Sequence, residues 1–166
     1  LRGTSVLLAH ASLGQALAVF AATPRKATHF TDSEMRELRA LVDAILPATD
    51  SPAASAADTH FFIDGALPLC ATAKAQATFR AGLADLARVQ FATKSAAEQV
   101  EILKARAAQD VPLQYDESFF KIAKDYTLTG YFLSETGATQ ALAYDKVPGG
   151  YWGDLPLTAA QKAWTL

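Results

Sequence analysis

The chain has one cysteine, no large excess of either charge and no long, strongly apolar run. Because Cys70 has no second cysteine to pair with, an intramolecular disulfide is excluded and cysteine usage does not indicate a compartment. Its neighbours in ALPLCATA are small and apolar. We therefore expect Cys70 to be a buried hydrophobic residue and not a reactive thiol.

Basic residues are too few to favour nucleic-acid binding. The 15 Lys and Arg residues are outnumbered by 17 Asp and Glu residues, which gives a formal net charge of -2. Proteins that bind phosphate backbones carry a basic surface. We therefore expect no nucleic-acid partner.

The sequence also lacks the common catalytic motifs. It contains no Gly-x-Gly-x-x-Gly, no phosphate-binding loop, no Gly-x-Ser-x-Gly and no convincing order of Ser, His and Asp. Acidic pairs such as Glu98 with Glu101 lie at predicted helix starts, where the helix dipole favours negative charge. We therefore expect no catalytic or cofactor-binding residue in this chain.

One pair of residues has a spacing that a metal site could use. His60 and Asp64 stand four residues apart in THFFID, so a helix would carry the imidazole and the carboxylate on one face. Two ligands do not hold a tight metal site, and a local hydrogen bond or cap is the alternative interpretation. Our expectation is that the chain binds no metal.

What the chain does contain is enough apolar residues for a real core. With 166 residues, 51% of them hydrophobic, it is long enough for one domain and too short to expect two. Amphipathic patterns of helical period recur and no run alternates convincingly with period two. The predicted class is all-α, a single compact helical domain of five or six helices.

Local signals place these helices. Thr31 with Glu34, and Ser95 with Glu98, have the capping-box spacing that begins a helix. The first of these helices ends at Pro47. Further helices are predicted from about Asp58 to Leu67, where Gly65 and Pro68 limit the length, over Lys74 to Phe91, and after a cap at Asp116.

The N-terminal segment from Val6 to Ala22 is mildly apolar and rich in small residues. It is a poorer match to a membrane span, which needs about 20 strongly apolar residues, than to the hydrophobic region of an export signal of the twin-arginine type. Only Arg2 precedes it, and no Arg-Arg pair is present. An ordinary N-terminal core helix is the alternative, and no direct membrane span is expected.

The C-terminal stretch from Ser134 to Asp154 combines turn signals with exposed-looking aromatic residues. Gly137 is predicted to be a left-handed helix cap, and Pro148 with Gly149 forms a turn. Tyr and Trp side chains anchor interfaces because they bury a large area and keep a polar group, although each could instead cover the core. The predicted partner-binding residues are Tyr131, Tyr144, Pro148, Tyr151 and Trp152.

Two long blocks carry a resemblance to a known family. LVDAILPATDSPAASAADTHFFID and TLTGYFLSETGATQALAYDKVPGGYWGD resemble the signature blocks of the gluconate 2-dehydrogenase subunit 3 family. The resemblance implies a non-catalytic small subunit that accompanies a large FAD-binding dehydrogenase of the glucose-methanol-choline type, often with a cytochrome c subunit. It also implies a twin-arginine signal on the small subunit and a periplasmic location for the complex. It provides no catalytic residues to assign here.

These observations divide the chain into residues 1–30, a signal-like segment and linker, residues 31–154, a helical subunit-3 domain, and residues 155–166, a C-terminal tail. The expected function is assistance in export, assembly and stability of a periplasmic flavoprotein that oxidises a sugar or glycoside. The first alternative is a stand-alone helical metal-dependent enzyme that uses His60 and Asp64. The second is a free-standing helical scaffold without a redox partner.

Overall fold

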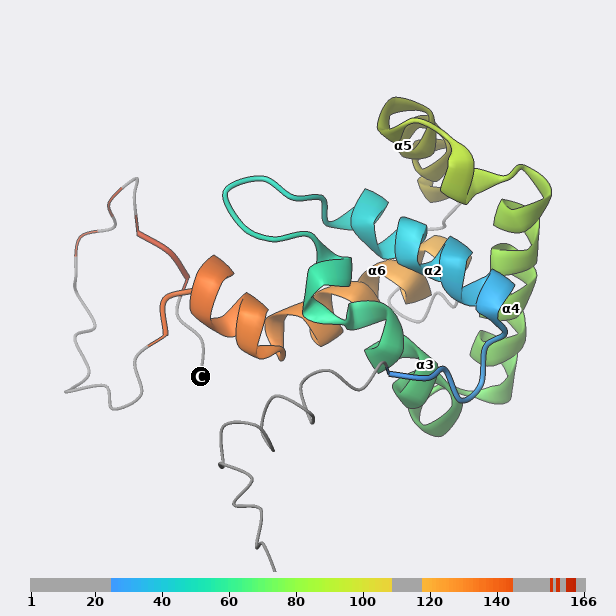
Figure 1. Cartoon of the computed structure of the whole chain (residues 1–166), viewed down its shortest axis with the longest axis horizontal. Helices are drawn as coiled ribbons and strands as arrows, with labels where there is room; N and C mark the ends of the chain where they lie inside the picture. The colour runs from blue at the N-terminus through green and yellow to red at the C-terminus, as the bar shows by residue number, and fades with distance from the viewer. Residues whose placement is uncertain (1–24, 109–117, 145–155, 157, 159–160, 164–166) are drawn as a thin grey trace, which may run out of the picture.

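The computed structural model describes residues 25–108, 118–144, 156, 158 and 161–163, and this part of the chain contains helices and no strand (Figure 1). The all-α prediction is therefore confirmed. The signal-like segment from Val6 to Ala22 and residues 145–155 lie outside the described residues. The α-helices are α2 (Asp32–Ile45), α3 (Thr59–Cys70), α4 (Ala73–Arg88), α5 (Ala96–Ala107) and α6 (Phe119–Phe132). Three short helical turns are η1 (Ala54–Ala57), η2 (Phe91–Thr93) and η3 (Gly137–Ala141), of which η3 is π-helical.

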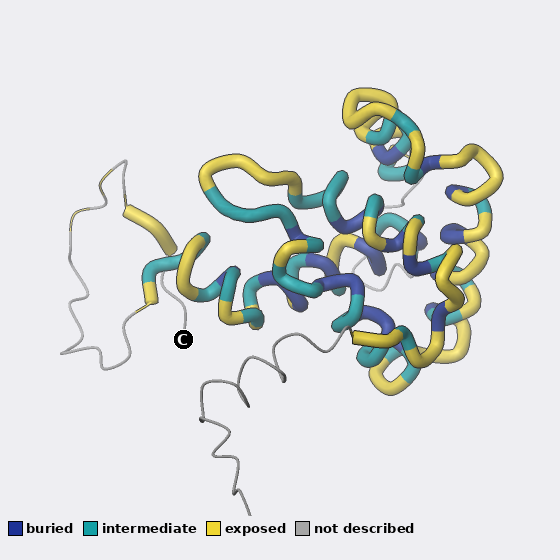
Figure 2. Tube along the Cα trace, in the orientation of Figure 1, coloured by how far each residue is buried: buried dark blue, intermediate teal, exposed yellow. Residues whose placement is uncertain are grey.

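The core lies where α2, α3, α4 and α6 meet, and the buried parts of the trace gather there in Figure 2. The apolar stripe predicted for α2 is buried at Met35, Leu38, Leu41 and Val42. Complete burial of one such leucine stabilises a fold by about 2 kcal/mol. Together the four helices enclose these side chains, whereas α5 adds only Leu103 to the buried set.

Both predicted capping boxes are present. The Thr31 hydroxyl accepts a hydrogen bond from the Glu34 amide, and the Glu34 carboxylate accepts one from the Thr31 amide at 2.8 Å. Ser95 and Glu98 make the same reciprocal contacts at the start of α5. Each box satisfies backbone N–H groups that the first helical turn leaves without partners.

Helix α3 is longer than predicted. It continues through Gly65 and Pro68 to Cys70, because Ile63 and Leu67 are anchored in the core and Pro68 removes only one N–H donor near the helix end. This extension carries the last turn into solvent, where Leu69 is 83% exposed. Cys70 is exposed as well, so the prediction of a buried cysteine is wrong.

Three other predicted boundaries differ from the structure. Helix α4 ends at Arg88, before the predicted Phe91, which instead begins η2. Helix α6 begins after Ser118, its N-cap, and the predicted cap Asp116 lies outside the described residues. Gly137 is no left-handed cap, because no glycine in the described part of the chain has a positive φ. It lies so close to the carbonyl of Tyr131 that no Cβ would fit.

Among the described residues, no helix has the length and apolar character needed to cross a membrane.

Candidate functional site

A groove of about 740 Å³ runs between α3 and the C-terminal end of α6. One wall includes Phe61 and Phe62 of α3, and the other is formed by Gly130 and residues 133–136. Charged residues also line the groove, namely Arg25, Lys26, Asp58, Asp64 and Glu135. Leu133, just beyond the end of α6, is 76% exposed on this wall. In Figure 1 this end of α6 and η3 extend away from the other helices. The groove therefore presents both aromatic and aliphatic surface at a projecting part of the molecule.

Two glycines shape the groove. Nothing lies within 4 Å of the place where a Cβ of Gly65 would stand, so the missing side chain leaves the groove open. At Gly130 a Cβ would lie 2.5 Å from the ring of Phe62. Gly130 is therefore what allows Phe62 to pack directly against α6.

Of the five predicted partner-binding residues, the structure describes two, and it places them differently. Tyr131 is 1% exposed, and its hydroxyl donates a hydrogen bond to the Pro52 carbonyl at 2.9 Å. Its side chain belongs to the core, so it offers no surface to a partner in this fold, which corrects the prediction. Tyr144 is 54% exposed. Pro148, Tyr151 and Trp152 lie outside the described residues.

The last described residues return to η3. Ala143 donates its amide hydrogen to the Ala163 carbonyl at 2.8 Å, and Lys162 Nζ donates to the Gln140 carbonyl at 2.6 Å. The stretch between Tyr144 and Gln161 therefore begins and ends beside η3. The groove wall and both ends of this stretch are therefore neighbours in one projecting part of the protein.

Asp64 has a structural role that its spacing from His60 did not reveal. Its Oδ2 atom accepts hydrogen bonds from the amide and hydroxyl of Thr28, at 2.6 and 2.8 Å. Its Oδ1 atom accepts from the amides of His29 and Phe30, at 2.9 and 2.8 Å. Burial raises the pKa of the Asp64 carboxyl, but these four hydrogen bonds together outweigh burial and lower its pKa below the ordinary value.

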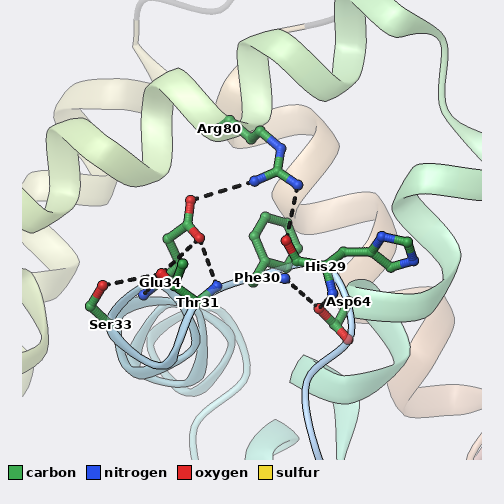
Figure 3. A network of polar contacts seen from close by, with 7 residues as sticks. All are labelled: His29, Phe30, Thr31, Ser33, Glu34, Asp64 and Arg80. Atoms are coloured by element: carbon green, nitrogen blue, oxygen red, sulfur yellow. Dashed lines mark hydrogen bonds and ion pairs between the residues drawn. The ribbon is translucent and has the colours of Figure 1, made fainter.

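The segment that Asp64 holds is also fixed from α4 (Figure 3). Arg80 donates to the His29 carbonyl at 3.2 Å and lies 3.5 Å from the Glu34 carboxylate. Its guanidinium also stands 4.8 Å from the centre of the Phe30 ring, a cation–π distance. Phe30 is buried and packs on Phe79. Residues 28–30 are thus held against both α3 and α4.

The proposed metal pair does not come together as a site. The Asp64 oxygens are directed to the 28–30 segment and have four donors. In the described part of the chain, no three His, Cys, Asp or Glu side chains gather as a metal site would require. The geometry therefore does not support the alternative of a metal-dependent enzyme built on His60 and Asp64. One of these two ligands, Asp64, already accepts hydrogen bonds from backbone amides.

His60 itself is buried and its Nδ1 atom has no hydrogen-bond partner among the described residues. Burial lowers the pKa of His60, and the positive charge of Arg39 lowers it further, while Asp58 and Asp43 act in the opposite direction. The ring stacks at an angle on Phe61, with 4.4 Å between the centroids. At neutral pH we therefore treat His60 as uncharged.

A comparison with protein families identifies the family of this chain. The model of the family described as gluconate 2-dehydrogenase subunit 3 matches residues 32–149, well over half of the chain. The chain belongs to the gluconate 2-dehydrogenase subunit 3 family. No curated protein and no solved structure matches it. The two blocks that carried the resemblance lie within this match or extend only a few residues beyond it.

Within this subunit 3 chain, sequence reasoning missed the groove and the Asp64 contacts. Residues 28–30 lie 34 to 36 positions away from Asp64, so no local spacing connects them. One available signal was the THF stretch directly before the Thr31 cap, where a buried aromatic residue beside a helix start is a common anchor. The groove had no comparable signal, because it depends on how α3 and α6 pack.

Proposed function

We propose that this chain is the non-catalytic small subunit of a periplasmic FAD-dependent sugar or glycoside dehydrogenase of the glucose-methanol-choline type. It assists the twin-arginine export, assembly and stability of the catalytic flavoprotein. The observation that carries the proposal is the family match over residues 32–149, since that family is named as a subunit of a dehydrogenase. FAD belongs to the partner chain, and a cytochrome c subunit is a further expected partner.

The groove between α3 and α6 is the surface proposed to contact the flavoprotein. Exposed apolar side chains that cluster beside a hollow are typical of interfaces, and Leu133 with the partly exposed Phe61 and Phe62 provides such a cluster. Tyr144, which follows η3 in the sequence, is 54% exposed. Tyr151 and Trp152 follow in sequence and extend the proposed contact.

Binding of this kind needs no chemistry from the small subunit. A chain that binds only the folded flavoprotein stabilises it by mass action, to an extent set by its concentration relative to the dissociation constant. The signal-like segment from Val6 to Ala22 supplies the export function in this proposal, because one export signal on the small subunit is enough for the whole folded complex. The two functions then reside in different parts of the chain.

The experiment that tests the proposal is affinity purification of the tagged full-length chain from its native cells. The mass of every co-purified chain and the visible spectrum of the eluate are recorded. A larger chain with an oxidised-flavin absorption band is the expected result. A lone and colourless chain, recovered under gentle conditions in which its helices remain folded, contradicts the proposal.

The groove is tested with matched substitutions of two exposed leucines. Leu133→Asp places a charge on the groove wall, whereas Leu69→Asp places the same charge on the last turn of α3, outside the groove. We expect Leu133→Asp to reduce recovery of the flavoprotein by about tenfold or more, since a desolvated charge in an interface typically weakens binding by more than 1.4 kcal/mol. Equal recovery with both variants would remove the groove from the interface.

A further inference from the structure

A second hollow adjoins the groove, with which it shares Arg25, Lys26 and Phe61, and basic residues are prominent in its lining. It has a volume of about 510 Å³ and lies between the first turns of α2, the start of α3 and the segment before α2. Four of its lining side chains are basic, namely Arg25, Lys26, Arg36 and Arg39, and one is acidic, Asp32. In a chain whose net charge is negative, this concentration of positive charge is unusual.

Most of these cations have no counter-charge within ion-pair distance in the part of the chain that the structure describes. Arg25 pairs with Asp58 at 3.3 Å. Lys26, Arg36 and Arg39 make no ion pair with the described residues. Asp32 offsets one of these three charges, which leaves an excess of two positive charges around the pocket.

A buried polar side chain also lines this pocket. His60 is 7% exposed, and its Nδ1 atom has no hydrogen-bond partner among the described residues. When Nδ1 carries the single proton of the uncharged imidazole, it is a buried donor without a partner, which is costly to a fold. A ligand that accepts a hydrogen bond would resolve this, while Met35 and Phe61 add apolar surface next to it.

We propose that this pocket binds a small dianionic oxyanion of the phosphate or dicarboxylate class. The excess of two positive charges matches a dianion, and guanidinium groups bind both phosphate and carboxylate oxygens through paired hydrogen bonds. The volume is in the range of small-molecule sites. His60 donates to the ligand from the pocket wall, and Arg36 and Arg39 hold it from one face of α2. The proposal of an anion site does not rest on the proposed role as a dehydrogenase subunit.

The test is calorimetric titration of the full-length chain with inorganic phosphate and, separately, with succinate, at constant ionic strength. We expect saturable binding of one anion per chain. Binding of phosphate alone assigns the site to phosphate compounds, and binding of succinate alone assigns it to dicarboxylates. No saturable heat with either anion overturns the proposal.

Matched arginine variants separate a built site from general charge attraction. Arg36→Ala and Arg39→Ala should each weaken binding by about tenfold or more, because each removes charge-assisted hydrogen bonds. Arg88→Ala removes an equal charge at an exposed site on α4 that pairs with Asp85, and it should leave the affinity unchanged. Equal weakening of binding by all three variants would show that the anion responds only to the net charge of the chain, and it would overturn the proposal. All three arginines are exposed, so the variants should fold.

His60 gives a second and independent readout. The charged groups that face it are Arg39 and Asp43 of α2, Asp58 at the start of α3, and the cations Arg25 and Lys26 of the segment before α2. A bound dianion adds negative charge beside the ring, so its pKa should rise when the chain is saturated with anion. The shift is measured from the ring proton resonances of His60. A pKa unchanged by saturating anion would place the bound anion elsewhere and overturn the assignment.

Discussion

At the scale of single residues, Asp64 holds the segment before α2 against α3 through four hydrogen bonds. One buried carboxylate accepts three backbone amides and a hydroxyl from the segment before α2. Without it, two part-buried amides and the buried amide of Phe30 would lose this partner, and a buried donor left without a partner costs about 1–3 kcal/mol. Its position on α3 therefore connects that helix to the start of the packed chain.

Asp64→Asn tests this role. The amide nitrogen of asparagine would face two of the four donors, so we expect the free energy of unfolding to fall by about 3 kcal/mol. Urea denaturation followed by circular dichroism measures the change. The matched control is Asp125→Asn, which removes an exposed pair with Lys121 and should change stability by less than about 1 kcal/mol. Similar losses in both variants would mean that the Asp64 contacts do not stabilise the fold.

His60 predicts a pH dependence of stability. Because its pKa is lowered in the folded state, the unfolded chain binds a proton more readily below the ordinary value of 6.5. The contribution of His60 to stability is therefore complete above pH 6.5 and is lost as the pH falls through the folded-state pKa.

The prediction is checked by urea denaturation of the wild type and of His60→Gln over this pH range, with no phosphate or carboxylate buffer. The variant should lose part of the dependence on pH that the wild type shows. His29→Gln is the control, because His29 is exposed. A wild-type stability that rises as the pH falls below 6.5 would contradict the sign of the effect.

At the scale of elements, the contact between α3 and α6 is set by a glycine. Gly130 lies where any Cβ would enter the ring of Phe62. The packing distance of the two helices, and with it the width of the groove, therefore depends on the missing side chain.

Gly130→Ala should accordingly destabilise the protein by about 1–3 kcal/mol, even though alanine favours a helix. Thermal unfolding measures the loss, and Phe62→Leu in the same chain should restore part of it by removing the ring. Gly65→Ala is the control, since open space surrounds its Cβ position. Stabilisation by Gly130→Ala would show that helix propensity outweighs the predicted clash.

At the scale of the whole molecule, the proposed role implies that assembly with the flavoprotein and folding of this chain depend on different residues. The C-terminal stretch with Tyr151 and Trp152 is proposed to contact the flavoprotein, whereas the buried core of the described residues is formed by side chains between Phe30 and Tyr131. Replacing Tyr151 and Trp152 with alanine should therefore reduce the amount of co-purified flavoprotein much more than it reduces helicity in the far-ultraviolet spectrum. The control is Leu69→Ala, an exposed side chain outside the groove. Equal losses of assembly and helicity would make the tail a cover of the core.

Local features of the fold were predictable and distant ones were not. The capping boxes at Thr31 and Ser95 were found from sequence because their partners lie three residues away. The end of α3 was predicted wrongly because the packing of Leu67 outweighs the local effect of Pro68. Tyr131 was assigned to a surface for another protein because Pro52, which accepts its hydrogen bond, is 79 positions away in the sequence. The candidate groove was missed for the same reason.

The sequence by itself determined the helical class, the start of two helices and, through two long blocks, membership of the subunit 3 family, which the family match confirms. These properties follow from periodicity, from spacings within one turn and from contiguous residues. Only the tertiary structure decided that Tyr131 belongs to the core, that Asp64 accepts hydrogen bonds from the backbone and that four basic residues line one pocket with His60. Burial and charge balance are properties of residues brought together from distant positions, and they exist only after the helices have packed.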